Sequence, residues 1–207
     1  MVEYNTWNSA DMHANLSLSG GDLVVTDGGP IGQKLVRGIQ SFSTGKFYWE
    51  YTVTITGGSA HCVGWCNSVQ PTSNQVGRTT TGHGWGYHAT GRIYHNNTYD
   101  SVDTYSQGNI IMIAIDLAAG KLWFGVNGTW LDSGDPGAGT GEQRNDINNL
   151  PLFPATSTYE GSQVGTANFG ASAFSYSVPS GFNAGVYTGE LAAGTRHGRR
   201  LNLGLIL

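Results

Sequence analysis

Charge is scarce in this sequence of 207 residues. Only 12% of the residues are charged, and the formal net charge is -4. A chain with so few basic residues lacks the positive surface that nucleic-acid binding requires. No apolar run approaches the roughly 18–20 residues needed to cross a bilayer. The first residues have neither the positive nor the apolar region of a signal peptide. We therefore expect no nucleic-acid partner, no membrane span, and folding in a cytoplasm.

Cysteine is also scarce. Cys62 and Cys66 are the only two, and they fall in a segment, 60–66, that we expect to be a strand. Four residues at about 3.3 Å each separate them by roughly 13 Å, whereas a disulfide needs Cα atoms within about 7 Å. The sequence therefore predicts two buried or half-buried thiols without a bridge, a state that suits a reducing compartment.

No segment has a sustained 3.6-residue period, and a period of two dominates instead, which is typical of strands. Segment 46–55 alternates between apolar and more polar residues. Segment 110–117 is apolar on both faces, which predicts a central strand. After a turn the chain returns through 121–126, and Asn127-Gly128 forms the next turn. Further strands are expected at 14–18, 22–26, 34–39, 60–66, 84–89, 92–95, 152–157, 163–169 and 173–177.

Many short strands separated by glycine-rich turns favour an all-β fold built as a two-sheet antiparallel β-sandwich. Glycine is abundant, with 32 residues, and aromatic residues make up 11% of the chain, which is enough for a core. Segment 132–149 is expected to be a long, irregular glycine-rich loop, and loops of this length are often functional.

The order of several short motifs resembles that of SPRY (B30.2-like) domains. These motifs are Gly45-Lys46-Phe47-Tyr48-Trp49-Glu50, Cys62-Val63-Gly64-Trp65, residues 86–96, the paired segments 108–116 and 120–128, Leu152-Phe153-Pro154-Ala155, Ala167-Asn168-Phe169-Gly170, and Pro179-Ser180-Gly181-Phe182. The resemblance implies two packed antiparallel sheets of the SPRY or jelly-roll kind, with binding through loops at one end or edge. It also implies a protein- or peptide-recognition module with no catalytic residues.

The resemblance ends at Phe182, so we expect a sandwich over 1–182 and a linker with a short extended C-terminal tail over 183–207. The tail contains a basic cluster followed by alternating leucines, and an extended tail of this kind exposes one apolar face. Such a strand needs a partner, which is either a sheet of its own domain or, as we favour, a sheet of a neighbouring subunit. The residues assigned to this assembly tail are Arg199, Arg200, Leu201, Leu203, Leu205 and Leu207.

Enzyme and metal chemistry find little support. The glutamates are scattered and form no pair on one strand, as a sandwich glycosidase requires. His61 and Cys62 are adjacent in a strand and therefore point to opposite faces. An extended strand also holds the cysteines too far apart for one zinc ion. The aspartates 132, 135 and 146 lack the spacing of an EF-hand, and turn capping explains them equally well. We expect no catalytic residue, no metal and no cofactor.

The best candidate for a ligand surface is segment 83–105, in which aromatic and histidine residues lie among glycine and asparagine. Such side chains bring a large contact area at low entropic cost. Strand alternation would also place about half of them in the core, and we expect the two histidines 88 and 95 at the surface. The candidate binding residues are Trp85, Tyr87, His88, Tyr94, His95 and Tyr99.

Two segments, 6–11 and 135–140, resemble the stand-alone SPRY proteins of phage and bacterial genomes. This similarity suggests a bacteriophage virion protein, such as a head decoration, fibre or tail-appendage subunit, found in the virion. Its partners would be other virion subunits and, in a homo-oligomer, copies of itself. The alternative is a lectin-like adhesin that binds a glycan on a host surface.

Overall fold

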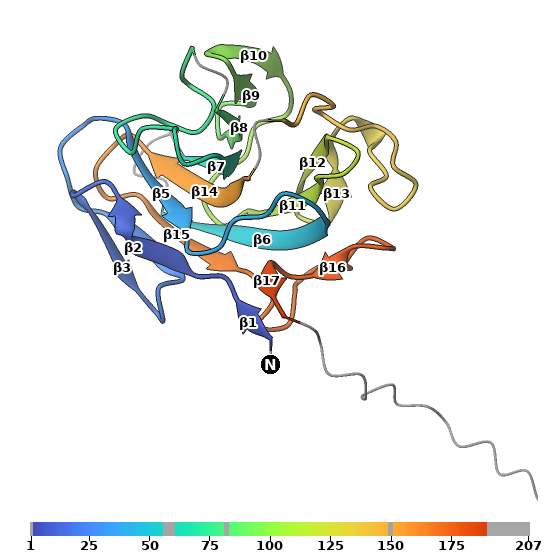
Figure 1. Ribbon diagram of the computed structural model, residues 1–207. Helices are drawn as coiled ribbons and strands as arrows, with labels where there is room; N and C mark the ends of the chain where they lie inside the picture. The colour runs from blue at the N-terminus through green and yellow to red at the C-terminus, as the bar shows by residue number, and fades with distance from the viewer. Residues whose placement is uncertain (1, 56–60, 81–82, 149–150, 190–207) are drawn as a thin grey trace, which may run out of the picture.

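The computed structural model describes residues 2–55, 61–80, 83–148 and 151–189. Within them the chain forms two large β-sheets packed face to face, and β1 and β17 form a separate two-stranded sheet (Figure 1). The first sheet has the order β10-β9-β8-β7-β14-β5-β2, and the second has the order β13-β12-β11-β6-β15-β4-β3, with β16 parallel to β6. All other pairings are antiparallel, so the predicted all-β sandwich is confirmed.

Most of the strands are short, and some are joined by tight turns and others by longer loops. The described residues contain one single-turn 3₁₀ helix, η1 (Leu131–Ser133), and none of their helices is long and apolar enough to cross a membrane. The strand bounds are β1 (Glu3–Tyr4), β2 (Trp7–Met12), β3 (Leu16–Ser19), β4 (Val24–Asp27), β5 (Lys34–Gly38), β6 (Lys46–Ile55), β7 (Cys62–Cys66), β8 (Gly84–His88), β9 (Arg92–His95), β10 (Thr98–Ser101), β11 (Ile110–Asp116), β12 (Lys121–Val126), β13 (Thr129–Trp130), β14 (Phe153–Thr158), β15 (Val164–Asn168), β16 (Asn183–Ala184) and β17 (Tyr187–Thr188).

The main core lies between the two sheets and is built by alternate residues of the strands. In β6, Phe47, Trp49, Tyr51 and Val53 point inward and are at most 5% exposed, as the alternation predicted. Buried aromatic rings dominate the packing, and each removes a large apolar area from water. The rings of Trp49 and Trp65 meet edge to face with their centroids 6.5 Å apart, which joins the two sheets. Trp7, Trp85, Tyr87, Phe124 and Phe169 belong to the same cluster.

The prediction that the segment apolar on both faces is a central strand is confirmed by β11. It lies between β6 and β12, and all of its residues except Ile110 are buried. Ile111, Ile113 and Ile115 enter the main core. Met112 and Ala114 lie on the other face, in a second buried cluster.

That second cluster exists because the outer face of the second sheet is covered. Residues 171–182 cross it without forming a strand, and Phe174 and Tyr176 pack against Tyr48 and Trp123. The strand expected at 173–177 is therefore wrong. The alternation of this segment is real, but its apolar side chains seal a sheet from outside instead of joining one.

One carboxylate fixes the covering segment. Glu50 of β6 is 3% exposed and accepts hydrogen bonds from the backbone N–H groups of Ser175 and Tyr176, both at 2.9 Å. The hydroxyl of Tyr48 donates to the same carboxylate at 2.8 Å. These bonds supply the partner that a buried charge requires, so Glu50 has a structural role.

The outer face of the first sheet buries the two thiols. Cys62 and Cys66 are free and buried, and they pack in one cluster with Leu35, Val76 and Ala155. The predictions that they share a face and form no disulfide with each other are confirmed.

The C-terminal end of the fold differs from the expected boundary. Strand pairing continues beyond Phe182, because β16 pairs with β6 and β17 pairs with β1. The linker expected from residue 183 is therefore in part a component of the sheets. The predicted tail residues Arg199, Arg200, Leu201, Leu203, Leu205 and Leu207 lie outside the described residues. In the expected loop 132–149, the isolated bridges Asp135–Thr140 and Leu122–Arg144 fix the path of the chain.

Candidate functional site

The predicted ligand surface is mostly interior. Trp85 and Tyr87 are 0% exposed, and Tyr94 is 4% exposed. His88 and His95 are 6% and 8% exposed, so the expectation that both histidines lie at the surface is wrong. Tyr99 alone among the six candidates presents a large area to solvent, with 49% of its surface exposed.

A compact network explains the burial of His95. Its ring stacks on Trp85 with centroids 4.6 Å apart and planes at 6°, and its Nδ1 lies 2.9 Å from the carbonyl oxygen of Gly84. Trp85 Nε1 donates to Asp146 at 3.0 Å, and Asp146 also pairs with Arg144. The network joins β8 and β9 to the loop after η1, so these residues position loops and offer little surface to a partner.

Tyr87 has a similar positioning role, and it leads to a surface hollow. Its hydroxyl donates to the carbonyl oxygen of Asp103 at 2.6 Å. The hydroxyl of Tyr105 donates to the carbonyl oxygens of Tyr87 and His61, at 3.0 and 2.9 Å. These bonds fix the segment that follows β10 and hold Asp103 and Thr104 at the edge of the sandwich.

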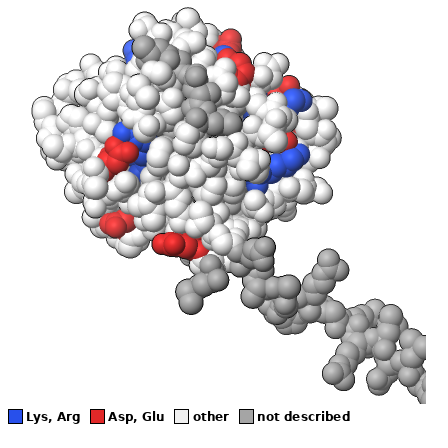
Figure 2. All heavy atoms as spheres, viewed as in Figure 1, with Lys and Arg blue, Asp and Glu red and all other residues white. Residues whose placement is uncertain are grey.

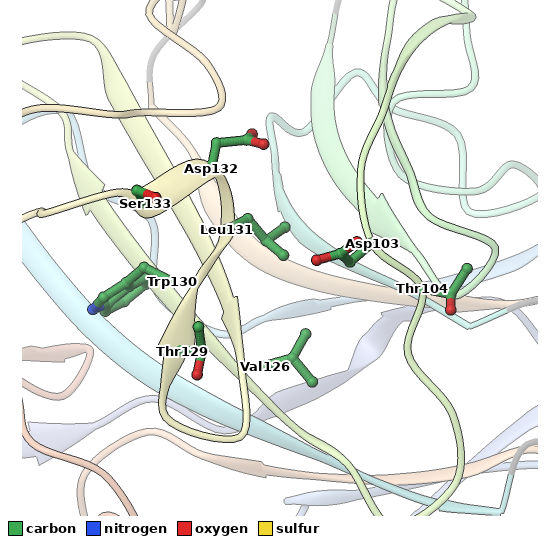
Figure 3. Close-up of a pocket in the computed structure, with 8 residues that line it drawn as sticks. All are labelled: Asp103, Thr104, Val126, Thr129, Trp130, Leu131, Asp132 and Ser133. Atoms are coloured by element: carbon green, nitrogen blue, oxygen red, sulfur yellow. The ribbon is translucent and has the colours of Figure 1, made fainter.

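The hollow at that edge, which we call the edge hollow, has a volume of about 700 Å³. One wall is the segment with Asp103 and Thr104, and the other is formed by β13, η1 and the end of β12 (Figure 3). The second wall contributes Val126, Thr129, Trp130, Leu131, Asp132 and Ser133. The lining residues include three with hydroxyls and two with carboxylates, which suit a polar, positively charged ligand.

Local sequence explains why the second wall projects here. Asn127 and Gly128 adopt φ values of 50° and 88°, as a tight hairpin turn requires, and the Asn127 side chain accepts a hydrogen bond from the N–H of Ile110 at 2.8 Å. Asp132 and Ser133 also have positive φ, 51° and 57°. Two successive non-glycine residues in this region are uncommon, and they turn the chain sharply at the rim of the hollow.

The edge hollow is acidic. Burial, and then the negative charges of Asp103 and Asp132, raise the pKa of the Tyr87 hydroxyl. Neither carboxylate takes part in an ion pair within the described residues. In the described part of the chain, the side-chain hydrogen bond to Asp132 is a long one, 3.5 Å from Gln143 Nε2. Two carboxylates without cations therefore face the same space.

The groups considered for catalysis or metal binding make other contacts. Burial raises the pKa of both thiols, Cys62 and Cys66, to about 12, and thiols that stay protonated at neutral pH are poor nucleophiles. Asp146 pairs with Arg144, and Asp135 accepts a hydrogen bond within its own turn. In the part of the chain that the structure describes, no three His, Cys, Asp or Glu side chains gather as metal ligands.

The family model described as "SPRY domain" matches residues 46–172 of this chain. The chain belongs to the SPRY domain family. The match covers β6 to β15 and the first residues of the segment that covers the second sheet, and it includes both walls of the edge hollow. No match to this SPRY domain was found among curated proteins.

Solved structures agree on the fold. The SPRY domain of human HERC1 superposes with a TM-score of 0.61 at 20% identity, over 78% of this chain and 96% of that one. The PSpry domain of TRIM65 superposes with a TM-score of 0.60 at 19% identity, over 80% of this chain and 90% of that one. At such low identity the comparison concerns the sandwich, and the side chains of the edge hollow have to be interpreted from this chain itself.

None of the six predicted binding residues lines the edge hollow. Segment 83–105 does contribute to the edge hollow, but through Asp103 and Thr104, which are small and polar. Trp130 and Asp132 come from β13 and η1. Of the two, the sequence draws attention only to Asp132, as a possible calcium ligand. The Asn127-Gly128 turn is the sequence feature that could have pointed to this wall of the hollow, because loops at the tips of hairpins often carry recognition residues.

Proposed function

We propose that this SPRY domain is a protein-recognition module whose edge hollow binds a basic, extended segment of a partner. One observation carries the proposal: Asp103 and Asp132 face one hollow without cations, beside the outermost strand of the second sheet. An outermost strand has backbone groups available for pairing with an added strand. The carboxylates then supply charge complementarity, which selects a basic partner over an acidic one.

The partner segment that we favour is the C-terminal tail of a neighbouring copy. Three of the ten basic residues fall in the tail, at 196, 199 and 200. Arg199 and Arg200 are followed by leucines at alternate positions, a pattern that places one apolar face against a sheet edge. In this proposal the arginines meet Asp103 and Asp132, and the leucines extend along β13.

We also propose that this assembly takes place in a virion, as a decoration, fibre or tail-appendage subunit. The support is the resemblance of segments 6–11 and 135–140 to stand-alone SPRY proteins of phage and bacterial genomes. Co-sedimentation of the protein with purified phage particles, detected by an antibody, tests this setting. Its absence from washed particles would exclude it, and would leave self-assembly to be judged separately.

The glycan-binding alternative has no observation in its favour. Lectin sites present aromatic faces to sugar rings, but Trp85 and Tyr87 are 0% exposed. A glycan array with the purified protein is the direct test, and we expect no signal from neutral sugars.

The assembly proposal is tested by measuring mass in solution. We expect the full chain to form oligomers, and a chain that ends at Ala193 to stay folded but monomeric. The double variant Asp103→Asn and Asp132→Asn keeps the shape of the hollow and removes its charge, so it should weaken assembly at least tenfold. Light scattering across a concentration series reports the mass, and circular dichroism reports the fold.

A matched control separates the hollow from charge in general. Glu3→Gln and Asp22→Asn remove two exposed carboxylates elsewhere and should leave assembly unchanged. A synthetic peptide of residues 196–207 should bind the shortened chain, and the Asp103 and Asp132 variant of that chain should bind it at least tenfold more weakly. Equal oligomer mass for the full and shortened chains would refute the tail as the partner segment.

A further inference from the structure

The basic residues of the described chain divide into two groups. Five of them pair with carboxylates: Lys34 with Asp27, Arg37 with Asp11, Lys46 with Asp116, Lys121 with Glu142, and Arg144 with Asp100 and Asp146. The other two, Arg78 and Arg92, pair with no carboxylate in the described part of the chain. Charges are few in this protein, and on the face shown in Figure 2 several of them lie in small mixed groups. Two unpaired cations therefore need an explanation.

Both unpaired arginines lie on the same outer surface of the first sheet. The guanidinium of Arg78 lies 5.0 Å from the ring centroid of Tyr94, and that of Arg92 lies 4.5 Å from the ring centroid of Tyr99. The two tyrosine rings meet with centroids 5.5 Å apart. Arg78, Tyr94, Tyr99 and Arg92 therefore form one continuous surface, which we call the arginine–tyrosine face.

Strand register keeps acidic side chains off this face. In the β9–β10 hairpin, Tyr99 pairs with Tyr94, so their side chains project to the same side. Asp100, the acidic residue of β10, projects to the opposite side, where it pairs with Arg144 at 2.8 Å. Alternation thus separates the one carboxylate of the hairpin from Arg92.

Glycine places Arg78 against the hairpin. Gly77 has a φ of 75°, and a Cβ atom there would lie 2.2 Å from the carbonyl oxygen of Tyr94. The N–H of Asn97 donates to the carbonyl oxygen of Gly77 at 3.0 Å. Only a residue without a side chain allows this approach, and it brings the next residue, Arg78, over Tyr94.

The arginines keep most of their donors unused. A guanidinium has five N–H donors. Among the described residues, the hydrogen bonds of the two side chains are one from Arg78 to Gln75 at 2.8 Å and one from Arg92 to the Tyr94 hydroxyl at 3.3 Å. Nε of Arg78 is buried and has no hydrogen-bond partner. Beside Arg78 lies a hollow of about 510 Å³, whose wall also includes His83, Asn97 and Thr80.

We propose that the arginine–tyrosine face is a second interaction surface, separate from the edge hollow, that binds an acidic segment of a partner protein. Arg78 and Arg92 receive its carboxylates, because the planar fork of a guanidinium matches a carboxylate. The exposed ring of Tyr99 supplies apolar contact between them. Stacking on the tyrosines holds both forks in place before the partner arrives, which lowers the entropic cost of binding.

Charge favours a protein segment over a nucleic acid as this partner. A nucleic-acid interface typically neutralises several phosphates, often about 6–10. This face offers two arginines on a chain of net charge -4. Two cations suit two or three carboxylates separated by uncharged residues, and a long polyanion is repelled by the rest of the protein.

The test uses the full-length protein and a fluorescein-labelled peptide with three glutamates separated by glycine and serine. Fluorescence anisotropy at low salt should show saturable binding, and a peptide with glutamine at the same positions should bind at least tenfold more weakly. Arg92→Gln changes an exposed side chain and should weaken binding about tenfold. Arg78→Gln combined with Arg92→Gln should remove it, and Tyr99→Ala should weaken it several-fold.

The matched control is Lys46→Gln, which removes one positive charge from the second sheet and should leave peptide binding unchanged. An equal loss in the Lys46 and Arg92 variants would refute the face and indicate attraction by charge alone. Tighter binding of an oligothymidylate or inorganic phosphate than of the peptide would overturn the assignment to a protein partner. Absence of peptide binding to the unmodified protein would overturn the proposal as a whole.

Discussion

The buried carboxylate of Glu50 allows the most quantitative prediction. It accepts three hydrogen bonds, two from the backbone N–H groups of Ser175 and Tyr176 and one from the hydroxyl of Tyr48. A hydrogen bond to a charged group contributes about 1.5–3 kcal/mol, and a buried donor left without a partner costs about 1–3 kcal/mol. Ser175 is exposed, so when the carboxylate is removed, water can replace part of the hydrogen bonding that the Ser175 N–H loses.

We therefore expect Glu50→Ala to lower the free energy of unfolding by about 3–4 kcal/mol, well short of the sum of three separate bonds. For a domain of this size, that corresponds to a fall in Tm of about 6–15 °C. Glu50→Gln keeps the shape, and one oxygen still serves two of the donors. This variant should lower the free energy of unfolding by about 1–2 kcal/mol. Its amide NH₂ group faces a backbone N–H donor and cannot accept a hydrogen bond from it.

Urea unfolding measures the free energy, and amide hydrogen exchange locates the effect. In the Glu50→Ala protein the exchange of Ser175 and Tyr176 should accelerate more than that of β11, since the covering segment loses its attachment before the core opens. Glu3→Ala, an exposed change, is the control. A loss below about 0.5 kcal/mol, or exchange that rises equally everywhere, would refute the idea that Glu50 fixes this segment.

Three further predictions follow from backbone packing and burial. Gly64→Ala places a Cβ 2.0 Å from the carbonyl oxygen of Trp85, so it should lower the free energy of unfolding in urea by more than about 3 kcal/mol. Gly28→Ala is the control: no atom lies within 4 Å of a Cβ there, and the free energy of unfolding should change by less than about 0.5 kcal/mol. Burial, and then the charges of Arg78 and Arg92, lower the pKa of His88 to about 4. The unfolded chain therefore protonates this histidine at a higher pH than the folded chain does, so the free energy of unfolding should fall as the pH drops from about 6.5 to 4. His88→Gln should reduce this dependence on pH, and an unchanged dependence would contradict the reasoning. Cys62 and Cys66 should resist iodoacetamide in the native protein and react in urea; equal rates in both states would contradict their burial.

Much of the fold could be predicted from the sequence because its strands carry the pattern locally. The alternation in β6 and the two apolar faces of β11 identify a sandwich and its central strands before any contact is known. The Asn127-Gly128 turn was equally clear, since positive φ restricts the residue types that can form it.

The failures arise where tertiary contacts decide. Residues 173–177 alternate like a strand, but within the described residues their backbone bonds to side chains and to no neighbouring strand. Glu50, more than a hundred residues away along the chain, accepts from two of the N–H groups, and Asn168 donates to the carbonyl oxygen of Ala173. His88 and His95 are polar residues that the fold buries. The ring of His95 stacks on Trp85 and lies beside Asp146, and the ring of His88 packs edge to face against Tyr94. No local pattern contains that information.

The candidate sites were the hardest to predict, for a related reason. Asp103, Asp132, Arg78 and Arg92 are notable only because none of them forms an ion pair with another described residue. A missing partner can be recognised only after every other charge has been placed in space. Sequence reasoning looked for large aromatic side chains. It therefore selected Trp85 and Tyr87, which the core buries, together with Tyr99, which is exposed on the arginine–tyrosine face.

The pairing of β1 with β17 has a practical consequence. Glu3 faces Thr188 and Tyr4 faces Tyr187 across a single pair of strands, so the two ends of the described chain leave the molecule side by side (Figure 1). Neighbouring strands lie about 4.8 Å apart, a gap that a short peptide can bridge. The sandwich is therefore suited to circular permutation, and to insertion as a complete cassette into a surface loop of another protein with little distortion of the host.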